Sequence, residues 1–204
     1  MSFYEDQVVP RLVNAMLGNK EFAKLRRHVA SGLAGEVLEV GFGSGLNVPY
    51  YPAAVTRVQA VDPATLGRRL AESRLAASTI PVEFVGLDGA QIPVESASID
   101  HVLITWTMCT IPDIETALAE MRRVLRPAGR MHFVEHGLAP DAKVATWQHR
   151  LNPLERRLAG GCNLNRPIDA LIAQAGFSFD ELETFYGKGP KSFSYLYKGV
   201  ASPA

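Results

Sequence analysis

Apolar positions recur at helical spacing near the start of the chain. Five apolar side chains follow the i, i+3, i+4, i+7, i+8 order of one helix face: Val9, Leu12, Val13, Met16 and Leu17. Gly18-Asn19 is a stop signal, and a second amphipathic stretch covers 22–29. The pattern predicts two short helices in a segment that ends at residue 34.

Between residues 35 and 136 the pattern changes repeatedly between strand and helix. Short β-branched runs, which predict strands, occupy 37–40, 57–62, 82–85, 99–104 and 131–135. Helical spacing covers 64–77 and 114–125, and Arg126-Pro127-Ala128-Gly129 is expected to end the second of these helices. Alternating strands and helices are typical of βαβ units, so an α/β fold with a parallel sheet is predicted.

The alternation stops after His136. A polar helical insertion is predicted at 140–160 and a helix at 166–175. Strand-like stretches at 181–186 and 193–200 flank a short Gly/Pro-rich connection, which favours an antiparallel hairpin. The 204 residues are expected to form one domain. Its predicted parts are an N-terminal helical segment (1–34) and a cofactor-binding core (35–136). A helical insertion or lid (137–165) and a C-terminal helix with the hairpin (166–204) follow.

Composition and charge exclude several classes of protein to which this chain could belong. A chain that is 47% hydrophobic and 21% charged is expected to fold rather than stay disordered. Lys and Arg total 21, as do Asp and Glu, and this balance removes the usual electrostatic basis for nucleic-acid binding. Two cysteines do not make a disulfide scaffold, so a reducing compartment is expected. No membrane-spanning run or signal peptide is recognised, and a cytoplasmic location is predicted.

The first two predicted strands end in residues suited to bind a ligand. Residues 39–45, Glu-Val-Gly-Phe-Gly-Ser-Gly, follow the first strand, and Asp62 ends the second. Ligands of parallel sheets lie at the carboxyl ends of strands, where glycine exposes backbone N–H groups and a carboxylate can accept both ribose hydroxyls. A dinucleotide fingerprint has glycine at its sixth position, which is Leu46 here, so a nicotinamide-dependent oxidoreductase is disfavoured. The anionic Glu39 favours a ligand with a cationic end.

With these motifs, the segment 35–136 resembles the class I S-adenosylmethionine-dependent methyltransferases. Residues 37–45 resemble their motif I, and Asp62 matches their ribose-binding acid. Leu-Asp-Gly at 87–89 matches the segment in which an acid meets the adenine amino group, and 125–130 is similar to their L-(K/R)-P-G-G turn. The resemblance implies a Rossmann-like sheet, mostly parallel with an antiparallel last strand and helices on both faces, and S-adenosylmethionine as the cofactor.

The same resemblance implies which residues bind the cofactor. They lie at or just after the ends of the first four predicted strands: Glu39, Gly41, Phe42, Gly43, Gly45, Asp62, Pro63, Asp88, Gly89 and Thr105. A non-catalytic module that binds S-adenosylmethionine is the alternative from a different class.

A narrower resemblance begins at Glu135-His136. Together with Trp-Gln at 147–148, Asn-Pro at 152–153 and Gly-Cys-Asn-Leu at 161–164, this pair resembles small-molecule methyltransferases whose animal members act on alkyl thiols. It implies that the methyl acceptor is a small molecule. A thiol is the preferred acceptor class, and a phospholipid amine or a quinol-type phenol is the alternative. The animal members carry an N-terminal membrane-anchoring segment that is not recognised here. Peripheral membrane contact of the 9–17 face and the oligomeric state stay open.

Methyl transfer from a sulfonium is an in-line displacement that depends on alignment and exclusion of water. The predicted acceptor pocket consists of Trp106, His136, Trp147 and Asn163. His136 is the candidate catalytic residue, since imidazole can take a proton from an acceptor. Cys109 and Cys162 are interpreted as buried structural thiols. A zinc site formed by both with His136 and His149 fits no finger spacing, so no metal is predicted.

Overall fold

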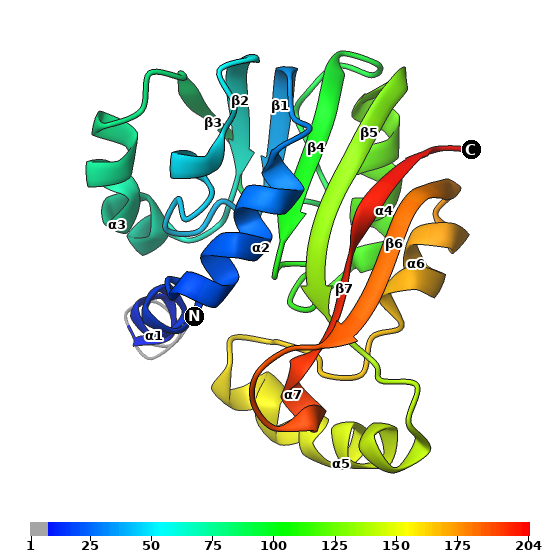
Figure 1. The fold of residues 1–204 in the computed structure, drawn as a ribbon. Helices are drawn as coiled ribbons and strands as arrows, with labels where there is room; N and C mark the ends of the chain where they lie inside the picture. The colour runs from blue at the N-terminus through cyan, green and yellow to red at the C-terminus, as the bar shows by residue number, and fades with distance from the viewer. Residues whose placement is uncertain (1–7) are drawn as a thin grey trace.

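The computed structural model describes residues 8–204, whose strands form a seven-stranded sheet in the order β3-β2-β1-β4-β5-β7-β6 (Figure 1). The strands are β1 (Gly35–Val40), β2 (Val55–Val61), β3 (Val82–Gly86), β4 (Ile99–Thr105), β5 (Leu125–His136), β6 (Phe177–Tyr186) and β7 (Tyr195–Pro203). The neighbours among β1 to β5 pair in parallel, while β7 runs antiparallel to both β5 and β6. The predicted fold, including the antiparallel last strand and the hairpin, is confirmed.

Helices lie on both faces of the sheet and beyond the carboxyl ends of its parallel strands. They are α1 (Val9–Leu17), α2 (Lys20–Ala30), the 3-10 turn η2 (Val48–Tyr50), α3 (Thr65–Ala76), α4 (Ile114–Val124), α5 (Ala142–Leu158), α6 (Ile168–Gln174) and α7 (Lys191–Ser194). In Figure 1, α2 crosses the front of the sheet and α4 and α6 lie behind it, while α1 and α5 lie below, where the parallel strands end.

Alternate residues of each central strand enter two different cores. Val37 of β1 belongs to a cluster with Val29 of α2, whereas its neighbour Leu38 belongs to a cluster with Met121 of α4 and Ile172 of α6. Successive side chains of a strand point to opposite faces, so a strand covered on both sides needs apolar residues throughout. This explains why consecutive apolar residues, Val37-Leu38 and Val102–Ile104, occur in the first and fourth strands.

Several boundaries differ from the sequence-based prediction. Strand β6 begins at Phe177 rather than at 181, because Phe177 already pairs with Pro203 of β7. Strand β5 begins at Leu125 rather than at 131, because Leu125 pairs with Ile99 before Arg130 pairs with His101, which leaves 126–129 outside the regular ladder. An ion pair between Arg126 and Asp100 lies at this irregularity. Residues 193–194, predicted as strand, belong instead to the one-turn helix α7.

Within residues 8–204, no helix is both long enough and apolar enough to cross a membrane. Helix α1 does expose apolar side chains, since Leu12 is 51% and Met16 is 67% exposed. The cytoplasmic location and the peripheral membrane contact considered from the sequence both stay predictions.

Candidate active site

The ends of four parallel strands come together at one edge of the sheet. Val40, the last residue of β1, lies opposite Val61 of β2 and Ile104 of β4. The backbone N–H of Asp62 donates to the carbonyl of Gly86 at 3.1 Å, which brings the end of β3 beside the end of β2. The strand order reverses between β1 and β4, and this is the place where open α/β sheets bind ligands.

Glycine is required at each turn of the loop after β1. Gly41, Gly43 and Gly45 have φ of 79°, 54° and 72°, a region that other residues rarely adopt. A Cβ at Gly41 would collide with Thr107, whereas a Cβ at Gly43 would meet nothing within 4 Å. The backbone of Gly43 therefore borders open space, which a ligand can approach closely.

Asp62 connects the end of β2 to this loop. One carboxylate oxygen accepts from the backbone N–H of Gly43 and the other from that of Ala64, both at 2.7 Å. Burial raises the pKa of Asp62, although the two backbone bonds act in the opposite direction. A buried carboxylate beside an open glycine backbone fits a ribose with its attached sulfonium, so these residues fit the cofactor that the sequence implies.

Glu39, predicted to attract the cationic end of a ligand, is buried in the protein interior. It is 1% exposed; Asn47 Nδ2 donates to its Oε1 at 2.9 Å, and the hydroxyl of Tyr51 donates to its Oε2. Burial raises the pKa of Glu39 to about 7. Because the Glu39 carboxylate is almost completely inaccessible, any influence on a cationic ligand acts through its charge and through the order of the loop.

A buried arginine completes this network. Arg26 of α2 donates through Nη1 to Asn47 Oδ1 at 2.9 Å and to Thr105 Oγ1 at 2.8 Å, and its guanidinium lies 4.6 Å from the ring centre of Trp106. Burial lowers the pKa of Arg26 to about 10, so it stays charged near neutral pH. Sequence reasoning missed Arg26, Asn47 and Tyr51, because no spacing along the chain relates them to Glu39.

The other predicted cofactor residues differ in accessibility. Phe42 is 2% exposed and packs edge-on against Phe84, so its side chain is part of the core rather than of a binding surface. Thr105 is buried and accepts a hydrogen bond from Arg26.

Two other predicted cofactor residues, Pro63 and Asp88, are exposed, and Asp88 Oδ1 accepts from the N–H of Ala90. Gly89 is partly buried behind Asp88. Cofactor contact at these positions stays a prediction.

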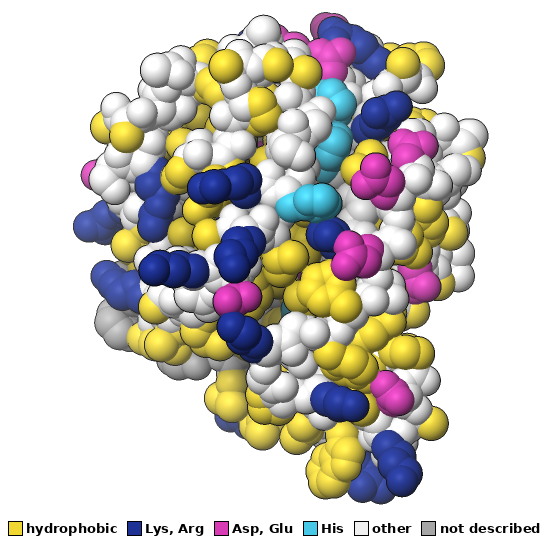
Figure 2. Space-filling model, in the orientation of Figure 1, with side chains coloured by type: hydrophobic (Ala, Val, Ile, Leu, Met, Phe, Trp, Pro, Cys, Tyr) yellow, Lys and Arg dark blue, Asp and Glu magenta, His cyan; other side chains and the backbone are white. Residues whose placement is uncertain are grey.

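A cavity of about 910 Å³ adjoins the end of β4. Its lining is mostly apolar and comes from α1, α2, the end of α5, the β6–β7 region and the segment after β4, which includes Trp106. Figure 2 shows hydrophobic side chains gathered in the lower part of this face, the region of α5 and α7 in Figure 1. An ion pair of 2.9 Å between Lys188 and Glu21, both lining residues, joins the C-terminal hairpin to α2.

The structure separates the four predicted pocket residues into two pairs. Trp106 and His136 line the cavity. Trp147 does not: it is 54% exposed on α5 and lies against Arg150, because the helix turns this position away from the cavity. Asn163 also lies outside the lining, since its side-chain amide donates to the carbonyl of Cys109 at 2.9 Å and holds two loops together.

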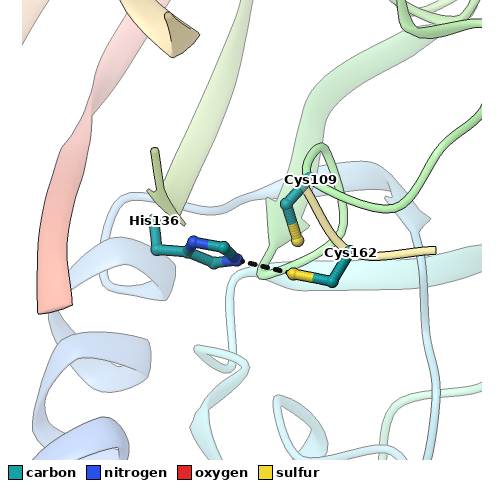
Figure 3. Close-up of side chains that lie close together, drawn as sticks. All are labelled: Cys109, His136 and Cys162. Carbon is teal, nitrogen blue, oxygen red and sulfur yellow. Dashed lines mark hydrogen bonds between the residues drawn. The ribbon is translucent and has the colours of Figure 1, made fainter. Parts of the chain in front are cut away.

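One end of the cavity is polar and carries both cysteines. Cys109, His136 and Cys162 all line it, and one donor atom from each lies within 4.8 Å of the others (Figure 3). His136 Nε2 and Cys162 Sγ are 3.0 Å apart. Hydrogen bonds from Cys109 and then from His136 lower the pKa of Cys162, whereas the interaction with Cys162 and burial raise the pKa of Cys109. The cysteines are buried, as predicted, but they adjoin the predicted acceptor pocket.

Comparisons with known proteins identify related methyltransferases. Residues 38–133 match the methyltransferase domain family. The chain is 34% identical over 175 residues to thiol S-methyltransferase TMT1A of Homo sapiens, covering 78% of this chain and 70% of that protein. It is 33% identical over 161 residues to TMT1B of Homo sapiens, covering 75% and 65%. A phosphatidylethanolamine N-methyltransferase of Cereibacter sphaeroides is 28% identical over 133 residues, covering 61% and 62%.

Solved structures show the same fold at low sequence identity. The [4+2]-cyclase SpnF superimposes with a TM-score of 0.75 at 15% identity, covering 98% of this chain and 94% of that one. A possible histamine N-methyltransferase of Thermotoga maritima gives 0.66 at 18% identity, covering 98% and 99%. Since a fold hosts many chemistries, these similarities support the architecture and leave the reaction to the site and to the closer relatives.

Proposed function

Because this chain belongs to the family of S-adenosylmethionine-dependent methyltransferases that includes TMT1A, we propose that its methyl acceptor is a small thiol. The observation that carries this proposal is the cavity after β4, whose lining includes Trp106 and Thr110. Thr107, which lies between them in the sequence, packs against Gly41 of the glycine loop. The cavity is mostly apolar and ends at two cysteines and a histidine. Such a cavity suits an acceptor with an apolar body and a single reactive polar atom.

In this proposal the two parts of the site have separate tasks. S-adenosylmethionine, when bound, supplies a methyl group already activated by the positive sulfonium. Asp62 and the Gly43 backbone would hold its ribose end at the tips of β1 and β2. The cavity would orient the acceptor and exclude water, and these are the main requirements of an in-line displacement.

A thiol must lose its proton to become a strong nucleophile, because the thiolate is the reactive form. The polar end of the cavity, formed by Cys109, His136 and Cys162, is the place where that loss would occur. The role of His136 as the group that takes the proton stays a prediction.

The first test measures release of S-adenosylhomocysteine from the purified chain with four acceptor conditions. These are an alkyl thiol, a phospholipid amine, a quinol and no acceptor. We expect release above the no-acceptor rate with the alkyl thiol. Release with the amine or the quinol alone would overturn the thiol assignment, and cofactor binding without release would favour a non-catalytic binding module. Asp62→Ala serves as the cofactor-site control.

Gly43→Ala is expected to weaken S-adenosylmethionine binding by about tenfold, or about 1.4 kcal/mol. The added methyl would enter the open space bordered by the glycine loop, since no protein atom lies within 4 Å. Calorimetric titration measures the affinity. Gly189→Ala is the matched control: its φ is also positive, at 120°, and its Cβ also meets nothing within 4 Å, but it lies in the loop before α7. Equal affinities of both variants would remove Gly43 from the binding site.

A further inference from the structure

We propose that Cys109, His136 and Cys162 form a binding site for a soft divalent metal ion such as Zn²⁺, with one coordination position open to the cavity. The proposal includes a role for that open position, which is to hold the sulfur of the acceptor. This second part rests on the proposed thiol methylation, whereas the metal site itself does not.

The donor atoms are already close to metal-binding geometry. One sulfur from each cysteine and one ring nitrogen of His136 all lie within 4.8 Å of one another. A tetrahedral zinc ion with Zn–S bonds of about 2.3 Å and Zn–N bonds of about 2.0 Å places its donors about 3.5–3.8 Å apart. Figure 3 shows the three side chains converging on one region from separate parts of the chain. Small side-chain adjustments would therefore complete a three-donor set.

The loops that carry the cysteines are held to each other by hydrogen bonds. The backbone N–H and the side-chain amide of Asn163, the residue after Cys162, both donate to the carbonyl of Cys109 at 2.9 Å. Arg166 donates to the carbonyls of Met108 and Ile111 on either side of Cys109. His136 is the last residue of β5. The protein fold itself thus sets the separation of the donors, as metal sites with strong affinity require.

The chemistry of the donors selects the class of ion. Thiolate and imidazole groups suit zinc and other soft or borderline ions, whereas Mg²⁺ and Ca²⁺ take oxygen ligands. Two thiolates neutralise the charge of one divalent ion. Zinc sites with three protein ligands keep a fourth position for water or substrate. Because all three residues line the cavity, that position faces the acceptor space.

An open metal position would explain how a thiol acceptor becomes reactive. The acceptor S–H bond breaks, its proton passes to water, and the thiolate sulfur bonds to the metal, since coordination favours the deprotonated thiol. A sulfur lone pair then forms the new S–CH₃ bond while the sulfonium C–S bond breaks. The products are a thioether and neutral S-adenosylhomocysteine, with no oxidant or reductant involved. His136 would act here as a metal ligand instead of a proton acceptor.

Titration of the reduced, metal-free chain with Co²⁺ tests the site directly. We expect one Co²⁺ per chain, with a sulfur-to-cobalt charge-transfer band in the near ultraviolet that disappears when Zn²⁺ is added. Cys109→Ser, Cys162→Ser and His136→Gln are each expected to abolish or strongly weaken the band. His149→Ala is the matched control, since this imidazole is exposed and bonds to Asn165 at 2.8 Å outside the cluster.

Two results would overturn the metal site: no thiolate band with excess Co²⁺, or an unchanged band in Cys162→Ser. Thermal unfolding of each variant checks that it folds. If Cys109→Ser is unfolded because the residue is buried, Cys162→Ser and His136→Gln decide the outcome.

Addition of an alkyl thiol to the cobalt-loaded chain tests the open position. A shift of the charge-transfer band by the thiol, but not by the alcohol of equal chain length, supports coordination of the acceptor. An unchanged spectrum at saturating thiol overturns that part. Methylation of a thiol by a chain that binds no Co²⁺ would overturn the metal site while the proposed function stands. A normal cobalt band without thiol methylation would support the metal site and refute the thiol acceptor.

Discussion

Replacing Asp62 by Ala is expected to weaken S-adenosylmethionine binding by at least about tenfold, since charge-assisted hydrogen bonds contribute roughly 1.5–3 kcal/mol each. Asp62 is 6% exposed at the end of β2 and faces the glycine loop through its bond to Gly43. The substitution removes the predicted ribose contacts and also releases the loop. Isothermal titration calorimetry measures the affinity directly.

Asp62→Asn removes the negative charge and only part of the loop contacts. The amide retains one carbonyl oxygen, so it can accept from only one of the two backbone N–H groups that Asp62 binds in the structure. We expect an affinity between those of the native chain and Asp62→Ala. Asp113→Ala is the control, because Asp113 also accepts a backbone N–H, that of Thr116 at the start of α4, but is exposed. Native affinity in Asp62→Ala would exclude the residue from the cofactor site.

Replacing Arg26 by Met is expected to lower the free energy of unfolding by about 3 kcal/mol at pH 8. Arg26 is 4% exposed and Glu39 is 1% exposed, and Asn47 connects them by hydrogen bonds. Removal of the guanidinium leaves a buried carboxylate without its nearby positive charge. Urea unfolding at fixed pH measures the loss, with Arg27→Met as the neighbouring exposed control.

This loss of stability should depend on pH with a definite sign. Burial raises the pKa of Glu39 to about 7, so the carboxyl is largely protonated in the folded chain well below that value. A neutral carboxyl needs no positive partner, and the effect of Arg26→Met should therefore be smaller at pH 6 than at pH 8. Combining Arg26→Met with Glu39→Gln should recover part of the stability at pH 8. An equal loss at both pH values would contradict a charge-based role.

The strands, the hairpin and the glycine loop follow from local sequence. Apolar alternation and turn residues act over a few positions, so the runs ending at Val40 and Val61 predict both the sheet and the place of Gly43 and Asp62. Parallel strands necessarily bring their carboxyl ends to one edge. For that reason, the cofactor side of the site could be predicted from residues that are nearly adjacent along the chain.

The remaining contacts of the site depend on tertiary packing between segments that are distant in the sequence. Arg26 meets Thr105 across 79 positions of sequence, and His136 meets Cys162 across 26. Neither spacing carries a local signal, because contacts of this kind depend on sheet register and on how loops pack against one another. Local sequence patterns were enough to predict the fold and the methyltransferase family. Packing decided that Trp147 points away from the cavity and that two cysteines and a histidine share one end of it.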